Sequence, residues 1–453
     1  MIYSQSNFNG SPVKRIINES LYSGITLGET KQGLFFSYNY SFYLNTNLPN
    51  LENINGKYLP RGYGSFNSSL FIFNHKYGSI TSEPTIYYKK KYEISIPKKE
   101  NEFSVLNDIP NNYNQEIILK NTGFKLQYYG ITTGFGNWNQ WWGPGIHNSL
   151  SLSNNASGFY HYFIKMDAKE IFDNNMDVFF KYLVSKPMKN LNGDKYFLSS
   201  LFFKIKYKIL ELGYNRNIIS GGHQDLNWSQ KDAFSVLINQ NKIKYWDTIN
   251  TYYILGNFKK IKLNVFLEIG FPNRSFAGYD PKSYSEHSMG SNIGLRKYGF
   301  IGIKELLFGI EYTRLVQGIY YNILPTPNWY DNKKFNYSSY NGRRWAAHSG
   351  SDSDDFLVYI GYLNKKISLI CGLNYERHGV TYHFPPEVKF ESRITVSYKH
   401  NDTKFYLNFE NEYFEHYGFV DSNINVWDET FEFGSIQRTK TLMFSIEHIF
   451  SFN

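Results

Sequence analysis

Residues Gly33–Thr46 read GLFFSYNYSFYLNT and alternate between large apolar side chains and side chains that are mostly small and polar. Because successive side chains of a β-strand point to opposite faces, this alternation predicts a strand with one apolar face. The stretch is longer than the ~5–6 residues of an ordinary globular strand. It matches the roughly 9–11 residues that a tilted strand needs to cross a bilayer. The apolar face would carry Leu34, Phe36, Tyr38, Tyr40, Phe42 and Leu44.

Similar two-faced stretches recur at Thr85–Ile96, Ser199–Ile209, Ile261–Ile269, Val388–Tyr398 and Leu442–Phe452. The second of them places Lys204, Lys206 and Lys208 on one face, and lysines suit a wet lumen better than lipid or a dry core. The last one ends on Phe450 and Phe452, and an aromatic-ended final strand is typical of outer-membrane barrels.

The composition agrees with a barrel in a membrane. The 453 residues include 40 Tyr and 38 Phe but only 14 Pro. The mean hydropathy is −0.46, and no run approaches the roughly 20 apolar residues of a membrane-spanning helix, which excludes a helical membrane protein. We therefore predict an all-β fold, a transmembrane antiparallel β-barrel, because closure leaves no unpaired backbone edge in lipid. A large soluble β-helix or sandwich, the alternative, should have shorter strands and denser turn signals.

We predict one domain over residues 1–453, with about 14–18 strands of membrane-crossing length. Residues 1–30 would form a lead-in that is partly helical or periplasmic. Met1–Phe8 lacks the basic and apolar regions of an export signal, so we expect either that a leader has been removed from this numbering or that the gene start is truncated. The single cysteine, Cys371, excludes intrachain disulfides and shares the phase of the apolar residue Leu373.

Short connections are predicted at Gly256–Lys260, Asn364–Lys366 and Lys399–Thr403, and short turns are typical of the periplasmic rim. The sequence does not determine from which rim residues 134–158 emerge, because one missed strand would move every later connection to the opposite rim. The longer segments are expected to be mostly external loops, some with additional strands, at 213–245, 270–304, 314–355, 376–387 and 410–438.

Two short helices are also expected. Ser229 is followed by Gln-Lys-Asp, which resembles a helix N-terminus with an acidic residue in the first turn, and Pro12–Leu21 is a second candidate.

Residues Gly134–Gly158, GFGNWNQWWGPGIHNSLSLSNNASG, interrupt the alternation between two predicted strands. A rigid tryptophan face is a good surface for the C–H face of a sugar ring, so the three tryptophans are candidate glycan contacts. The Gly-Pro-Gly element favours a tight turn, however, and we predict a mainly structural role for the motif. The residues concerned are Trp138, Trp141, Trp142, Gly143, Pro144 and Gly145.

The segment Gln140–Phe159 resembles the signature of the Wzi family of capsule-assembly outer-membrane proteins, and Asn341–Tyr362 and Glu387–Lys399 resemble later segments of the same family. The chain differs from the family pattern at Ile146, where members often have an aromatic residue. The resemblance covers roughly positions 120–453 and implies an outer-membrane barrel of about 18 strands with a few short accessory helices. It also implies a surface lectin that holds capsular or related exopolysaccharide at the cell surface, in a family not known to be enzymes.

The loop 314–355 is the better candidate for contact with polysaccharide. Adjacent arginines offer bidentate contacts to carboxylates, which acidic capsules carry. The net charge of +9 agrees with an acidic polymer, and also with the anionic lipid of an outer membrane. A merely solvated loop is the alternative, and no nucleic-acid partner is predicted. The candidate contacts are Trp329, Tyr330, Tyr340, Arg343, Arg344, Trp345 and His348.

The sequence also contains features of three other functions. Asp352, Asp354 and Asp355 offer hard oxygens for calcium, but their spacing lacks the glycine and distal glutamate of a known calcium loop, so no metal or cofactor is predicted. A hydrolase built on His147 with Ser149, or on His348 with those aspartates, is not predicted, because a triad is recognised by spatial geometry. A porin or uptake channel, favoured by the lumen-type lysines, is the alternative to the lectin.

Overall fold

The computed structural model describes residues 32–48, 52–57, 59–89, 116–171, 175–189, 194–222, 229–235, 246–272, 289–316, 329–330, 338–341, 343–381, 385–417 and 436–451. The N-terminal lead-in, the helix expected over Pro12–Leu21 and the second half of the strand predicted at Thr85–Ile96 lie outside these residues. One domain over 1–453 stays a prediction.

The described residues form one closed antiparallel sheet. Eighteen strands make its wall, and β8 adds a two-residue extension beside β9. The strands are β1 (Gly33–Asn45), β2 (Gly62–His75), β3 (Gly78–Lys89), β4 (Glu116–Tyr128), β5 (Ile131–Gly136), β6 (His161–Glu170), β7 (Met176–Ser185), β8 (Met188–Lys189), β9 (Lys195–Tyr207), β10 (Leu210–Gly221), β11 (Trp246–Phe258), β12 (Leu263–Pro272), β13 (Gly290–Tyr298), β14 (Leu306–Arg314), β17 (Ser353–Leu363), β18 (Ile367–His378), β19 (Glu387–His400), β20 (Thr403–Glu415) and β21 (Ile436–Ser451).

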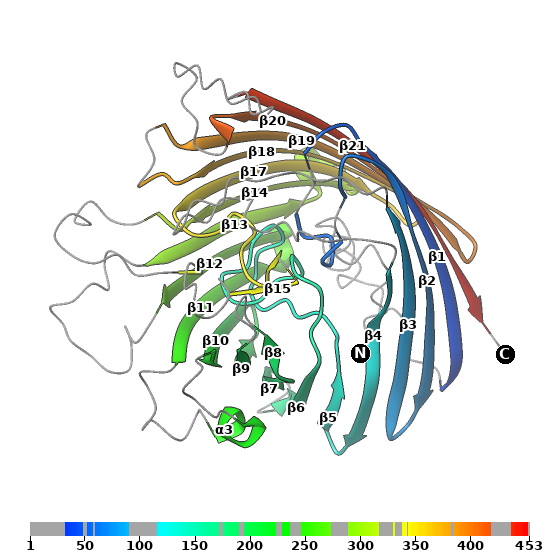
Figure 1. Cartoon of the computed structure of the whole chain (residues 1–453), viewed down its shortest axis with the longest axis vertical. Helices are drawn as coiled ribbons and strands as arrows, with labels where there is room; N and C mark the ends of the chain where they lie inside the picture. Colours follow the sequence, from blue (N-terminus) through cyan, green and yellow to red (C-terminus); the bar gives the residue numbers. More distant parts are fainter. Residues whose placement is uncertain are drawn as a thin grey trace, which may run out of the picture.

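The barrel closes where the first strand pairs with the last. Consecutive strands pair as antiparallel neighbours, and β21 pairs with both β20 and β1. At this seam Phe36 lies opposite Phe450 and stacks on it, with 5.1 Å between the ring centroids. Figure 1 shows the resulting ring of strands. The predicted antiparallel barrel is therefore confirmed, and its eighteen strands fall at the top of the predicted range.

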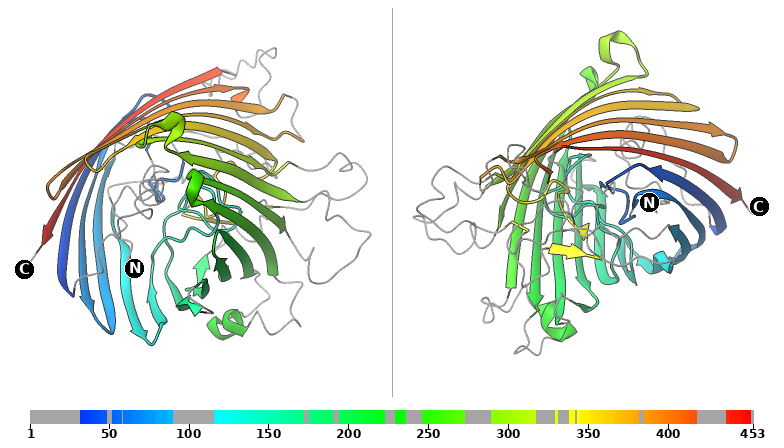
Figure 2. Two further views of the ribbon diagram at one scale, coloured as in Figure 1. Left: turned by 180° about the vertical axis from the view of Figure 1, so that it is seen from behind. Right: turned by 45° about the horizontal axis from the view of Figure 1, so that its top comes forward.

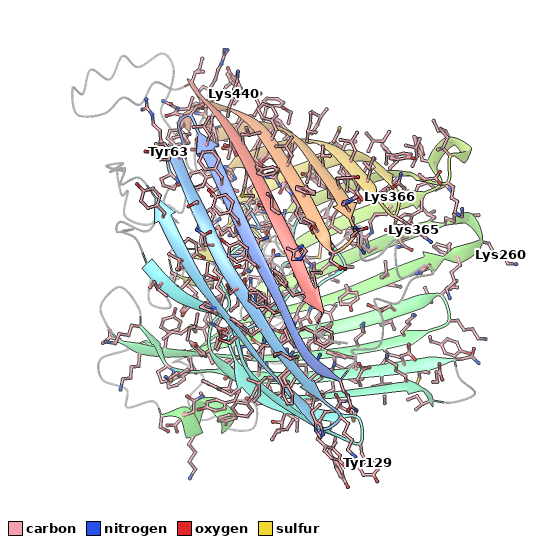
Figure 3. The ribbon with its side chains drawn as sticks, turned by 90° about the vertical axis from the view of Figure 1, so that its right-hand side faces the viewer. Tyr63, Tyr129, Lys260, Lys365, Lys366 and Lys440 are labelled. Carbon is pink, nitrogen blue, oxygen red and sulfur yellow. The ribbon has the colours of Figure 1, made fainter. Side chains whose placement is uncertain are left out.

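The predicted division of each strand into two faces is also confirmed. In β1, the apolar phase points away from the interior, whereas Asn39, Ser41 and Tyr43 are buried inside. Large aromatic residues near the strand ends are exposed on the outer surface, including Tyr63 near one rim and Tyr129 at the other (Figure 3). Such a distribution is typical of the aromatic girdles of outer-membrane barrels.

Eight short connections lie at one rim. They join β2 to β3, β4 to β5, β6 to β7, β9 to β10, β11 to β12, β13 to β14, β17 to β18 and β19 to β20. The turn predicted at Asn364–Lys366 has the predicted bounds, and Figure 3 shows Lys365 and Lys366 at this rim with Lys260. The longer connections, including residues 137–160, lie at the opposite rim. The structure thus shows from which rim this segment emerges, which the sequence did not determine.

Several strands extend beyond their predicted bounds. β10, β17, β18 and β20 each include residues that were expected to lie in external loops, and β13 is an additional strand within 270–304. The strand predicted at Ser199–Ile209 ends at Tyr207, so Lys208 lies in the turn with a positive φ of 51° instead of on the strand face. Lys204 does lie on that face, 3.4 Å from the Glu211 carboxylate.

Helical structure is minor. Helix α3 (Gln230–Ser235) begins after Ser229, as predicted, and the Asp232 carboxylate accepts a hydrogen bond of 2.9 Å from the Ser229 backbone N–H. Two 3-10 turns, η3 (Lys259–Ile261) and η4 (Phe300–Gly302), occur in short connections. No helix in the described part of the chain is long and apolar enough to cross a membrane.

Candidate functional site

The connection between β5 and β6 folds into the barrel. Residues 137–160 form this inner segment, and every residue from Trp142 to Ala156 is buried. Figures 1 and 2 show the segment inside the ring of strands, beside the small hairpin of β15 (Ser339–Tyr340) and β16 (Arg343–Arg344). A buried segment without regular structure needs partners for its backbone polar groups. The barrel wall and two other loops supply them.

Glu311 of β14 is the strongest of these partners. One carboxylate oxygen accepts a hydrogen bond from the backbone N–H of Ile146 at 2.8 Å, and the other accepts from His147 at 3.2 Å and Asn148 at 2.7 Å. Hydrogen bonds to an ionised acceptor are about twice as strong as neutral ones. A single buried carboxylate of the wall thus fixes three consecutive residues of the inner segment.

Side chains of neighbouring strands bind the backbone carbonyls of the same segment. Asn215 of β10 and Asn292 of β13 donate to Trp142 and Asn148 at 3.3 and 3.0 Å. The remaining wall contacts are Asn217 with the Ser151 carbonyl at 2.9 Å, Arg296 with the Pro144 carbonyl at 3.1 Å, and Glu268 with the Leu150 N–H at 3.4 Å.

The three tryptophans of the inner segment contact other parts of the same chain. Trp142 is buried and stacks on Phe202 of β9, with ring centroids 5.4 Å apart. The indole N–H of Trp141 donates to the Gly145 carbonyl at 2.9 Å, and that of Trp138 donates to Thr81 of β3 at 3.1 Å. These contacts agree with the predicted structural role, which stays a prediction.

The Gly-Pro-Gly turn has no room for larger residues. A Cβ on Gly143 would lie 2.8 Å from the Ser149 hydroxyl, and one on Gly145 would lie 2.7 Å from the Glu311 carboxylate and collide with the Asn148 carbonyl. Both glycines are therefore needed for close approach to their neighbours. Ile146, which follows them, is buried in a small apolar cluster of the wall.

The described residues of loop 315–352 pack over the inner segment. Six of the seven predicted polysaccharide contacts are buried there, and Tyr340 is half-buried. That these side chains bind polysaccharide stays a prediction. Tyr330 donates to the Leu150 carbonyl at 2.9 Å and Arg344 to the His348 carbonyl at 2.9 Å. The others are Arg343, 3.2 Å from the Lys57 carbonyl, and Trp329 and Trp345 in the main apolar cluster of the interior.

The three aspartates considered for calcium bind different partners. Asp352 accepts hydrogen bonds from the Thr381 backbone N–H at 2.9 and 3.0 Å, and Asp354 pairs with Arg377. Asp355 points inward to the Asn148 amide at 2.6 Å. The Ser149 hydroxyl donates to the Trp142 carbonyl at 2.7 Å.

A cluster of buried charged residues lies under the inner segment. Lys389 of β19 lies 3.1 Å from Glu391, 3.2 Å from Glu376 and 3.5 Å from Glu412, and it also contacts Glu52. The carboxylates of this cluster outnumber its lysine and arginine. Its members are Glu52, His147, His348, Asp355, Glu376, His378, Glu387, Lys389, Glu391, Arg393, Glu410 and Glu412.

The excess of carboxylates raises the pKa of His147. Burial lowers the pKa of His147, but the nearby carboxylates of Asp355, Glu311 and Glu376 raise it by more, to about 9. A buried imidazole surrounded by carboxylates favours a positive charge at this point.

Most described residues of loop 46–61 also lie inside the barrel. The side-chain amide of Asn53 donates to the His147 carbonyl at 2.6 Å, and the Asn55 backbone N–H donates to the Asn154 carbonyl at 2.9 Å. Burial lowers the pKa of Lys57 to about 7, and the nearby Lys120 ammonium adds to this effect. Parts of three loops from one rim are thus held together inside the barrel.

His147, His348 and Asp355 were named from the sequence, but the other residues that hold this assembly were not. The polar, inward-facing phases of the wall strands carry Glu311, Asn292 and Glu376. A carboxylate in the middle of such a phase is the sequence feature that could have indicated a buried partner for an inner segment.

Comparisons with known proteins identify the family. Residues 63–401 match the model of the family described as capsule assembly protein Wzi. The Escherichia coli outer-membrane protein Wzi, described as involved in group 1 capsule assembly and as a carbohydrate-binding β-barrel, has a similar structure with a TM-score of 0.64 and 12% identity, covering 99% of this chain and 89% of that one.

Weaker structural matches are Acinetobacter baumannii OccAB4, with a TM-score of 0.48 and 10% identity over 93% of this chain and 99% of that one, and Pseudomonas aeruginosa OprD, with 0.48 and 6% over 94% and 98%. No curated protein sequence matches the chain. The family match covers well over half of the 453 residues. The chain therefore belongs to the capsule assembly protein Wzi family of outer-membrane β-barrels.

Proposed function

We propose that this protein acts as a lectin-like barrel that anchors or organises capsular polysaccharide or exopolysaccharide at the cell surface. The observation that carries the proposal is the family match over residues 63–401, together with the Escherichia coli relative that is described as carbohydrate-binding. The family is not known for enzymatic activity, and the inner segment is bound through its backbone as a structural element.

We also propose that the polymer is acidic and that the outer face of the barrel contacts outer-membrane lipid. The net charge of +9 favours an anionic partner. The exposed apolar phase of strands such as β1 supports a lipid-facing wall, because apolar side chains alternate outward along it.

Loss of the protein should release polymer without stopping its synthesis. In a strain that lacks the gene, we expect most of the polysaccharide to move from the cell pellet to the medium, while the total amount stays within about twofold of the parent. The measurement is the ratio of cell-bound to released polysaccharide, with the complemented strain as control. Unchanged surface retention would rule out the anchoring role.

Among the seven predicted polysaccharide contacts, Tyr340 can be replaced without removing a fully buried side chain, so its substitution tests sugar binding. It is half-buried and packs edge-on against Phe159 at 6.1 Å. If Tyr340 stacks on a sugar ring, Tyr340→Ala should weaken the binding of purified protein to the acidic polymer about tenfold, the equivalent of ~1.4 kcal/mol.

The matched control for this binding measurement is Tyr298→Ala, which removes a half-buried tyrosine at the short-turn rim. Equal affinity of the Tyr340 variant and the parent protein would exclude sugar contact at this position.

A further inference from the structure

Five histidine and carboxylate side chains meet where the inner segment, the two other inward loops and the wall come together. His147 belongs to the inner segment, His348 to loop 315–352 and Glu52 to loop 46–61. Asp355 and Glu376 face them from the wall strands β17 and β18. All five are buried.

The ligand atoms lie at distances that suit a shared ion. The Nε2 atoms of His147 and His348 are 3.2 and 3.3 Å from the same Asp355 oxygen, Oδ2. His348 Nε2 also lies 3.5 Å from Glu376 and 3.9 Å from Glu52. Ligands that bind zinc tetrahedrally at about 2.0–2.1 Å are separated from one another by about 3.3–3.4 Å. A charge-assisted N–H···O hydrogen bond is shorter, at about 2.7–2.9 Å.

Hydrogen bonding leaves part of this group unsatisfied. Nε2 of His348 is buried and makes only the long ion-pair contacts given above, and the buried Oδ1 of Asp355 has no well-formed hydrogen bond. A buried polar atom without a partner costs free energy, and a native structure usually explains it by water or an ion. His147 Nε2 also lies 2.8 Å from the Asn374 side-chain amide, and a metal would bind the unprotonated form of this imidazole.

We propose that His147, His348, Asp355 and Glu376, with Glu52 as a further donor, bind one divalent transition-metal ion. Two imidazole nitrogens with carboxylate oxygens are a donor set of zinc and its neighbours, whereas calcium and magnesium prefer oxygen alone. Zn²⁺ is the expected ion. Its two positive charges also offset the local excess of carboxylates.

The ion would act as a structural cross-link. Its ligands come from three loops that are separated by about a hundred residues or more along the chain, and from two adjacent wall strands. A metal that binds only when these parts are together stabilises the folded interior in proportion to its affinity. Bound metal would hold the three loops inside the barrel.

The test measures metal binding to the whole protein, purified without a histidine-containing affinity tag. Protein freed of metal with a chelator is titrated with Co²⁺, whose visible absorption reports nitrogen and oxygen ligation, and then with Zn²⁺, which should displace it. We expect one ion per chain, and an unfolding temperature raised by about 3 °C or more at a hundredfold excess of zinc over Kd.

The matched variants are His147→Gln with His348→Gln, and His161→Gln as control. His161 is a buried histidine on β6 that contacts the Phe159 carbonyl and lies outside the cluster. The double variant should lose the Co²⁺ absorption and the zinc-dependent shift, while the control keeps both.

Two results would overturn the proposal. If protonated histidines supply the positive charge, the parent protein takes up less than a tenth of an ion per chain, a result that needs no variant to fold. If the folded double variant binds Co²⁺ as the parent does, the ion is held elsewhere.

Discussion

Glu311→Ala is expected to detach the inner segment from the barrel wall. The substitution removes the acceptor of three backbone N–H groups in a buried position. Each unsatisfied donor costs about 1–3 kcal/mol, so the three together should destabilise the buried position of the segment by roughly 3–9 kcal/mol. Wild-type barrels should give little steady current in planar bilayers, and the variant should give large, fluctuating currents with easier proteolysis of residues 137–160.

Two further variants identify the cause. Glu311→Gln keeps the shape and one acceptor oxygen but directs an NH₂ group at backbone donors, so we expect an intermediate current. Glu305→Ala removes a glutamate from the turn before the same strand and should behave as the parent does. A Glu311→Ala barrel with unchanged current would contradict the anchoring role. A large steady current through the parent protein would instead favour the channel function.

Gly145→Ala should disturb the same turn by steric means. The added Cβ would meet the Asn148 carbonyl, the Asn292 amide and, at 2.7 Å, the Glu311 carboxylate. Because backbone cannot move aside cheaply, overpacking of this kind costs about 1–3 kcal/mol, and the hydrogen bonds to Glu311 would weaken with it. We expect an unfolding temperature several degrees lower and a clear loss of polymer retention.

Gly372→Ala is the matched control for this steric argument. Gly372 lies in the wall strand β18, where an added Cβ would find its nearest neighbour at 3.5 Å, an ordinary van der Waals contact. This variant should unfold within about 1 °C of the parent. Equal stability of the Gly145 and Gly372 variants would show that the turn tolerates a side chain.

The wall of the barrel was predictable because its signal is local. Alternation over a dozen residues, as in Gly33–Thr46, fixes both the strand and the face that points outward. The Ser229 helix start was readable for the same reason, since the serine and Asp232 cap the helix within one turn. Strand ends were less exact, as Lys208 shows, because turn geometry overrides the alternation there.

The interior was not predictable in the same way. The inner segment reaches partners far along the chain: Leu150 binds Glu268, and Ile146 binds Glu311. The loop 315–352 is rich in arginine and tryptophan, which suits an exposed loop and the polar inside of a barrel equally well. The charged cluster joins His147 to Asp355 and Glu376, and no local pattern connects these positions.

The seam between β1 and β21 sets the order in which the molecule can form. The first strand is synthesised early but obtains its second neighbour only when residues 436–451 exist. Most wall partners of the inner segment, from Asn215 to Asp355, also follow it in the chain, although Thr81 of β3 precedes it. Contacts of such long sequence separation form slowly. The interior therefore reaches its final structure late, after most of the wall has been synthesised. A chain that lacks its last strand would leave β1 and β20 as unpaired edge strands, which are prone to aggregation.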